Sequence, residues 1–285
     1  MSVSAAPVTE MTLSVSALLA LQRVVGVSML PAHLRVRPQL LRVSDQQLSI
    51  TAEEAEVLIA AGLLDEGGRP DSDAATVVRA LASGDAEINV TLEARDRATT
   101  YVCLVRRHEL FVSAVRCGDD VVIDAFTGLN EHQVTALVAE LMDRYVFDSH
   151  DDDPADIDRW SGPMTPIHEA LQSQETASRG WADSLGDLGV PRGVATTLFH
   201  SETSWLARAE IGAYLNHEGS RSDPDTIVRV AATGIGAVMT SFASDNNRQR
   251  WLTVEPYEPE RMERLISSAI RSVPLAAWFS HSRTD

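Results

Sequence analysis

The stretch AEINVTLEARDRATTYVCLVRRHELFVSAVRCGDDVVIDAF, residues 86–126, decides the fold of this 285-residue chain. Its four runs rich in β-branched and aromatic residues are AEINVTLEA (86–94), TTYVCLVRR (99–107), ELFVSAVRC (109–117) and DVVIDAF (120–126). Apolar and polar residues alternate within the runs, and short polar breaks separate them. Strands so close in sequence pair most simply with their neighbours, so the stretch predicts an antiparallel meander.

The same order of elements returns in the second half of the chain. Its runs typical of strands cover residues 204–215, 225–233, 236–244 and 248–256. The first run of each set carries Ala-Glu-Ile, at Ala86-Glu87-Ile88 and at Ala209-Glu210-Ile211. Helical segments precede each set, and an amphipathic helix follows it, after Asn130 in the first half and from Pro259 in the second. This repeat indicates an internal duplication.

We therefore predict an α+β fold: a central antiparallel β-sheet with helical bundles, built from two quasi-symmetric halves. The N-terminal half covers residues 13–147 and the C-terminal half residues 163–280, and each holds helices, a four-strand meander and a closing helix. The two half-sheets are expected to join, because joining covers exposed edges, with the helices at the ends of the sheet or on one face. The first dozen residues are expected to form a frayed tail.

An acidic stretch, DSHDDDPADID at 148–158, lies between the two halves and holds six aspartates. It lacks the glycine bend and the glutamate at position 12 of a calcium-binding loop. Blocks of like charge are usually solvated because they repel each other. We predict an acidic linker over residues 148–162, whose aspartates can be replaced by Asn or Ser with little effect on folding or on partner binding.

The net charge of −17 argues against nucleic acid and anionic membranes as partners, because both need a basic surface. The N-terminal apolar run is broken by Gln22 and Arg23, so we expect neither a signal peptide nor stable membrane insertion. We therefore expect a cytoplasmic protein. The spacing of Cys103 and Cys117 predicts two free, buried thiols rather than a disulfide.

The sequence contains no phosphate-binding loop, no dinucleotide-binding glycine motif, no zinc-binding histidine pair and no nucleophile elbow. We therefore predict no cofactor, no metal site and no catalytic residue. An enzyme of unrecognised type stays open if carboxylates such as Asp124, Glu87 and Glu210 converge in one pocket. A structural protein that self-associates through a sheet edge is a further alternative.

Two C-terminal segments, LGVPRGVATTLFHSETSWLARAEIGAYLNH (188–217) and RLISSAIRSVPLAAWF (264–279), resemble the EspG family of type VII (ESX) secretion-associated proteins of mycobacteria and related actinobacteria. The N-terminal segment ITAEEAEVLIAAGLLDEGGRPDSDAATVVRAL (50–81) is also similar, and the likeness spans roughly residues 13–280. The residues that carry it in the C-terminal half are Leu188-Gly189-Val190-Pro191, Ser204-Trp205, Glu210-Ile211, Val273-Pro274 and Ala277-Trp278-Phe279.

This resemblance implies a cytosolic, non-enzymatic chaperone without a cofactor. Such a protein binds the helical tip of the PPE subunit in PE/PPE heterodimers, keeps that cargo soluble and directs it to its cognate ESX system. Family members use the loop between the second and third meander strands, the central sheet and the C-terminal bundle. The loop corresponds here to Arg106, Arg107, His108 and Glu109, which are the expected partner-binding residues.

Overall fold

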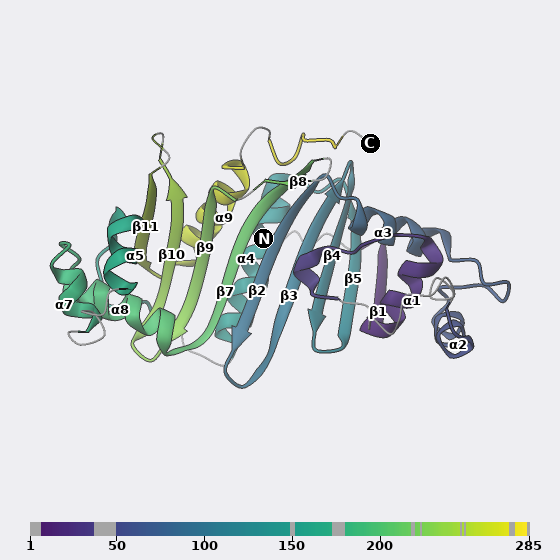
Figure 1. Cartoon of the computed structure of the whole chain (residues 1–285), viewed down its shortest axis with the longest axis horizontal. Coiled ribbons are helices and arrows are strands. Elements are labelled where there is room, and N and C mark those ends of the chain that lie inside the picture. The colour runs from purple at the N-terminus through teal and green to yellow at the C-terminus, as the bar shows by residue number, and fades with distance from the viewer. Residues whose placement is uncertain are drawn as a thin grey trace.

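One antiparallel sheet runs through the whole molecule (Figure 1). The computed structural model describes residues 7–36, 50–148, 152–172, 180–217, 220–222, 224–245, 247, 249–273 and 277–283. The strands are β1 (Thr9–Ser14), β2 (Ala86–Ala94), β3 (Arg97–Arg107), β4 (Leu110–Cys117), β5 (Asp120–Thr127), β6 (Trp160–Pro163), β7 (Trp205–His217), β8 (Ser220–Arg221), β9 (Thr226–Thr233), β10 (Gly236–Ser244) and β11 (Arg250–Pro256). Their order is β1-β5-β4-β3-β2-β7-β9-β10-β11-β6, with β8 paired to β7, so the predicted fold class is confirmed.

The two halves join where β2 pairs with β7. Aligning the repeats at Ile88 and Ile211 makes Val90 equivalent to Ala213. The pairing is then symmetric, because Ile88 lies opposite Ala213 and Val90 lies opposite Ile211. The pair between them, Asn89 and Gly212, therefore marks a quasi-twofold axis. Outward from this axis the two meanders follow in the same order, β3-β4-β5 on one side and β9-β10-β11 on the other.

Two helices cover the centre of the rear face, α4 (Glu131–Phe147) and α9 (Pro259–Arg271) (Figure 1). Both begin as predicted: Asn130 and Gln133 form a capping box on α4, and Pro259 occupies the first turn of α9. Their apolar stripes pack on the rear side chains of β2, β7 and β9 and close the largest hydrophobic core. The buried apolar residues of the two helices are Val134, Val138, Ala139, Met142, Val146, Met262, Ile266, Ala269 and Ile270.

The remaining helices cover the two ends of the front face. The N-terminal group, over β3 to β5, comprises α1 (Val15–Val25), the 3-10 helix η1 (Ala32–Leu34), α2 (Ala52–Ala60) and α3 (Ser72–Ala82). The C-terminal group, over β9 to β11, comprises α5 (Met164–Gln172), α7 (Trp181–Gly186) and α8 (Arg192–Thr203). Among the described helices, none is long and apolar enough to cross a membrane.

Helices therefore lie on both faces of the sheet, and the expectation of one face or the ends alone was wrong. The physical reason is visible in β3. Cys103 and Val105 are buried beneath the front helices, while Val102 and Leu104 are buried in the rear core. A strand with apolar residues on both sides needs a cover on both sides.

Two short edge strands were not predicted from the sequence. Residues Thr9–Ser14, of which the first four were expected in a frayed tail, form β1, which pairs with β5 and buries Met11 and Leu13. Residues Trp160–Pro163, of which the first three were expected in the acidic linker, form β6, which pairs with β11. Both strands gain their order from the long strand beside them. The thiols are free as predicted, but Cys117 is exposed at the end of β4, and the prediction that it is buried was wrong.

The described part of the acidic stretch is fixed by its backbone. The amide of Ala155 donates to the carbonyl of Ala237 at 2.9 Å, and the amide of Ala237 donates to the carbonyl of Asp153 at 2.8 Å. The aspartates at 148, 152, 153, 156 and 158 are exposed, while residues 149–151 lie outside the described part. The carboxylates thus face solvent although the chain that carries them is anchored. The domain boundaries at 148 and 162 stay a prediction.

This anchoring requires a glycine at position 236. Gly236 has a φ of +114°, and a Cβ there would lie 2.6 Å from the Cα of Ala155. We expect Gly236→Ala to lower the free energy of unfolding by at least about 2 kcal/mol, because backbone strain and a steric clash add up. Gly234→Ala, in the same turn, is the control, since its Cβ would meet no atom within 4 Å. Urea unfolding of both variants measures this difference, and equal stabilities would contradict the anchoring role.

The C-terminal tail ties the two halves together on the rear side. Trp278 is 1% exposed, and its indole Nε1–H donates to the carbonyl of Glu87 at 3.2 Å. In return, the guanidinium of Arg106 donates to the carbonyl of Trp278 at 2.7 and 3.1 Å. The ring also lies near Phe111, with the two ring centroids 6.3 Å apart. A residue that follows α9 thus fills the core of the N-terminal half. Pro274, one of the residues of the family resemblance, lies outside the described part.

We expect Trp278→Ala to destabilise the protein by about 3–5 kcal/mol, because it leaves a large cavity and unpaired polar groups. Trp251→Ala removes the same side chain from the surface of β11, where it is 36% exposed, and should cost less than about 1 kcal/mol. Denaturant midpoints of the two variants test this contrast. A cost for Trp278→Ala no larger than that of the control would refute the role of the tail.

Candidate functional site

Within the described part of the chain, the middle of the front face is left uncovered between the two groups of helices (Figure 1). Strand register places charged side chains there, because residues that alternate with the rear core point forward. Glu93 comes from β2, Arg208 and Glu210 from β7, and Arg229 from β9. An uncovered sheet with charged residues in its interior strands is a surface on which another molecule can dock.

Ion pairs link these side chains across the strands. The Nε of Arg208 lies 2.6 Å from Oε2 of Glu93, and Arg229 contacts both Glu210 and Glu202 of α8, the latter at 3.0 Å. Each group is partly exposed, and ion pairs in water stabilise a fold by about 1 kcal/mol or less. The ion pairs therefore fix a pattern of charge on the open face but contribute little to the stability of the fold.

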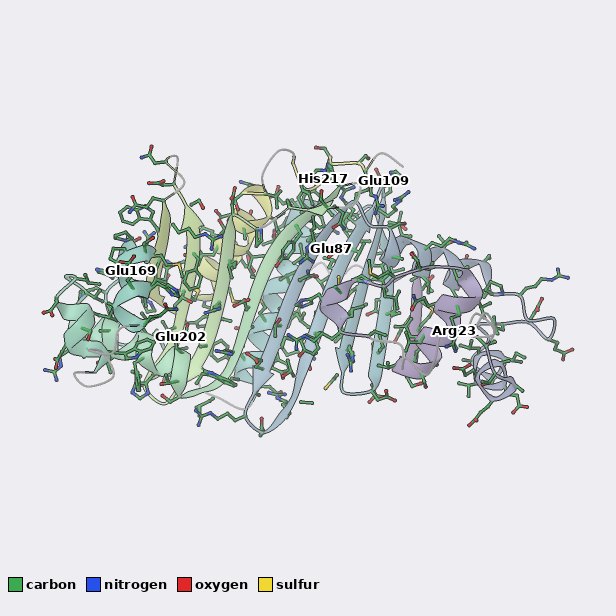
Figure 2. All side chains as sticks on the ribbon, in the orientation of Figure 1. Arg23, Glu87, Glu109, Glu169, Glu202 and His217 are labelled. Carbon is green, nitrogen blue, oxygen red and sulfur yellow. The ribbon has the colours of Figure 1, made fainter. Side chains whose placement is uncertain are left out.

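A second polar group occupies one end of the open face. The carboxylate of Glu87 accepts from the side-chain amide of Asn216 at 2.8 Å and lies 3.4 Å from the guanidinium of Arg221 (Figure 2). That guanidinium also stacks on the ring of Tyr214, 4.0 Å from its centroid. Nearby, the buried side-chain oxygen of Asn89 has no hydrogen-bond partner among the described residues, so an approaching donor would be favoured there.

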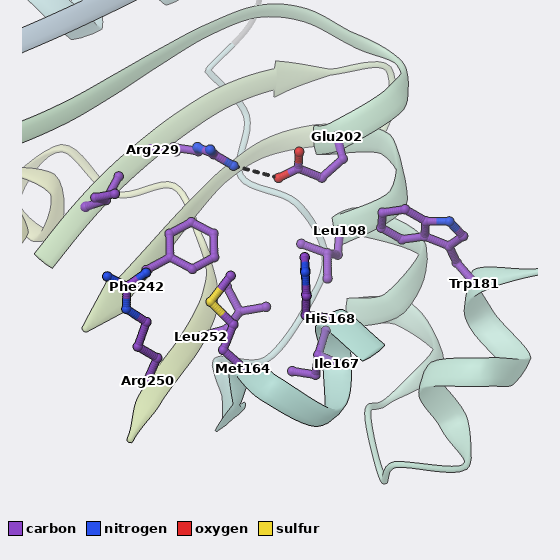
Figure 3. A pocket seen from close by; sticks show the side chains of 11 residues that line it. Met164, Ile167, His168, Trp181, Leu198, Glu202, Arg229, Phe242, Arg250 and Leu252 are labelled. Atoms are coloured by element: carbon purple, nitrogen blue, oxygen red, sulfur yellow. Dashed lines mark hydrogen bonds and ion pairs between the residues drawn. The ribbon is translucent and has the colours of Figure 1, made fainter. Parts of the chain in front are cut away.

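A pocket of about 330 Å³ continues the open face toward the C-terminal helices (Figure 3). Its lining residues are Met164, Ile167, His168, Trp181, Leu198, Glu202, Ile227, Arg229, Phe242, Arg250 and Leu252. Trp181 packs edge-on against Phe199 with centroids 5.5 Å apart, and Phe199 is itself partly exposed. The walls are thus mainly apolar and aromatic.

Charged groups accompany this apolar lining. Arg229 and Glu202 belong both to the pocket and to the ion pairs of the open face, so the two features form one surface. The guanidinium of Arg229 also lies over the ring of Phe242, 5.2 Å from its centroid. A concave apolar site with a few charges suits an apolar side chain that enters from a partner, while the charges select its surroundings.

The structure places the four residues of the predicted partner-binding loop at the tip of the β3–β4 hairpin. Arg106 is only 3% exposed. Its guanidinium donates to the carbonyls of Trp278 and His281 and lies 3.6 Å from the carboxylate of Asp85. Burial lowers the pKa of Arg106 from its usual value. This side chain therefore holds the C-terminal tail.

The other three loop residues differ in exposure. Arg107 donates to the carbonyl of Ser83 at 2.5 Å. The backbone amide of His108 donates to Asp85 at 2.8 Å, while the imidazole is 64% exposed. Glu109 is exposed as well (Figure 2). The loop lies outside the pocket, and its contact with a partner stays a prediction.

The three carboxylates considered for catalysis do not meet. Glu87 and Glu210 point from the front face, where each is engaged by a different arginine. Asp124 points from the rear face of β5, because its neighbour Ile123 is buried in the front core. Burial and the nearby charge of Glu10 raise the pKa of Asp124. Among the described residues, no cluster of three or more His, Cys, Asp or Glu could hold a metal ion.

The pocket was missed in the sequence analysis because its lining comes from six elements. Ile227 of β9 and Phe242 of β10 are partly buried apolar residues, and no local pattern distinguishes them from core residues. Without the packing of α5, α7 and α8, nothing indicates that the surface around them stays partly open.

Comparisons with known proteins agree with this architecture. The family model of the EspG family matches residues 14–268. The ESX-5 secretion-associated protein EspG5 of Mycobacterium tuberculosis (strain H37Rv) is 26% identical over 188 residues, and EspG5 of Mycobacterium marinum (strain M) is 24% identical over 188 residues. In both cases the alignment covers 64% of this chain and 61% of the relative, less than two thirds of the relative's length.

Similarity in structure extends further than similarity in sequence. The solved structure of the type VII secretion system chaperone EspG5 of Mycobacterium tuberculosis, in complex with a PE25-PPE41 dimer, aligns with a TM-score of 0.79 at 20% identity. That alignment covers 96% of this chain and all of the other, so the two proteins share their fold. Because the family match spans most of the sequence, the chain belongs to the EspG family.

Proposed function

We propose that this protein is a secretion chaperone that binds the PPE subunit of PE/PPE heterodimers, keeps this cargo soluble and directs it to its cognate type VII (ESX) secretion system. The observation that carries the proposal is the apolar pocket that opens onto an uncovered sheet face. Membership of the EspG family and the fold shared with an EspG5 chaperone solved with a PE25-PPE41 dimer support it.

The physical basis is the burial of an apolar tip. A helical partner that ends in exposed apolar side chains tends to aggregate, and it gains free energy when a preformed pocket removes that surface from water. Trp181 and Phe242 offer aromatic walls for such side chains. The ion pairs of Arg208 and Arg229 form a fixed pattern of charge, and a partner with the complementary pattern is favoured over others.

In this proposal the hairpin tip borders the binding surface. His108 and Glu109 point outward and can contact a partner, whereas Arg106 and Arg107 hold the tip and the C-terminal tail in place. The proposed role is non-catalytic and needs no cofactor. It also places the protein in the cytoplasm, because a chaperone has to meet its cargo before secretion.

We expect the purified protein to form a stable complex, one copy of each chain, with a PE/PPE pair encoded in its source genome, as measured by light scattering after size exclusion. Trp181→Ala should weaken this complex at least about thirtyfold, because an aromatic anchor at the centre of an interface contributes about 2 kcal/mol or more. Trp251→Ala, a tryptophan outside the pocket lining, should leave the affinity unchanged.

The two parts of the proposal fail in different ways. Absence of a complex with every PE/PPE pair of that genome would refute the chaperone function. A complex that Trp181→Ala and Trp251→Ala weaken equally would leave the function standing but refute the pocket as the binding site. Circular dichroism of both variants shows that they are folded.

A further inference from the structure

A separate hollow of about 530 Å³ lies on the rear side, between α4 and α9. Glu131 and Thr135 of α4 and Glu263 and Ser267 of α9 are among the residues that line it. The sheet separates these two helices from the open front face (Figure 1). An occupant of this hollow would therefore not compete with one on the front face.

The buried hydroxyl of Thr135 lacks the partner that it would be expected to have. Thr135 is 5% exposed, and its Oγ1 has no hydrogen-bond partner among the described residues. In a helix a threonine hydroxyl usually donates to the carbonyl four residues earlier, as Thr76 does at 2.8 Å and Thr203 at 2.7 Å. Leaving a buried hydroxyl unpaired is costly, so a polar partner for this group, beside the hollow that Thr135 lines, would be favourable.

The charges around the hollow indicate the sign of that partner. Glu131 is already occupied, since Arg271 lies 2.5 Å and the hydroxyl of Ser267 2.9 Å from its Oε1. Glu260 reaches only an exposed Arg264, at 3.9 Å. Glu263 forms no ion pair with any described residue. Arg264, Arg271 and His132 also line the hollow, so three carboxylates face two arginines there. The carboxylate of Glu263, in a chain with a net charge of −17, is left to favour a cationic group.

We propose that the hollow between α4 and α9 is a second binding site, which receives an arginine or lysine side chain from a basic segment of another protein. The cation pairs with the carboxylates of Glu260 and Glu263, and its N–H group donates to the hydroxyl oxygen of Thr135. This site lies on the face opposite to the front pocket and does not rest on the proposed chaperone function. A second protein could then bind while the front face is occupied.

The test uses the full chain and a peptide of sequence Gly-Arg-Gly-Arg-Gly, followed by amide NMR shifts at low salt. We expect shifts at Thr135 and Ser267 that saturate, and none with a peptide in which citrulline replaces arginine. Glu263→Gln should weaken binding about threefold, the size expected for an exposed ion pair. Glu140→Gln makes the same change on α4 at an exposed residue outside the hollow and should have no such effect.

Thr135 provides an independent readout. Thr135→Val removes the unpaired hydroxyl at constant shape, so the free protein should melt at the same or a higher temperature while it binds the peptide more weakly. Thr135→Ser keeps the hydroxyl and should keep the affinity. The proposal is overturned if the peptide shifts no amides of the hollow, if Glu263→Gln and Glu140→Gln weaken binding equally, or if Thr135→Val lowers the melting temperature of the free protein.

Discussion

The antiparallel pairing of β2 with β7 is the constraint on which the rest of the structure depends. It runs without a break from Ala86 opposite Leu215 to Ala94 opposite Ala207. In a separate half-sheet, β2 or β7 would be an edge strand with unpaired backbone groups, which is unfavourable. Joined, the halves let α4 and α9 pack together over the seam and close one rear core. The short strands β1 and β6 are left as the outer edges of the described sheet.

The same symmetry explains why the site lies where it does. Both groups of front helices are displaced to the ends, so no described helix covers the region around the quasi-twofold axis. The alignment of Ile88 with Ile211 also aligns the front positions of β3 with those of β9, so that Cys103 corresponds to Ile227. In the N-terminal half, the front core around Cys103 is filled by side chains such as Leu34 of η1. In the C-terminal half, the equivalent place is the pocket, so the candidate site lies where the two halves differ in their front packing.

Local patterns were sufficient to predict most of the fold. Alternation predicted the eight meander strands, and the caps at Asn130 and Pro259 predicted the two rear helices, because these signals act between residues close in sequence. β1 and β6 were missed because short strands carry few alternating residues and take their order from β5 and β11. The cover on the front face was missed for a related reason, since it depends on which distant segments pack together.

The site was harder to predict because its residues act over long distances in the chain. Arg106 lies at the end of a strand beside a polar turn, which is the local pattern of an exposed residue. It is nevertheless buried, and it donates to the carbonyl of Trp278, 172 residues later in the chain. Some of the residues that carry the family resemblance are buried as well, namely Val190, Ile211 and Trp278, whereas Leu188 is exposed. Buried residues of this kind indicate how the chain folds and hence to which protein family it belongs. The pocket, in contrast, is lined by side chains such as Trp181, which only the packing of distant segments brings together.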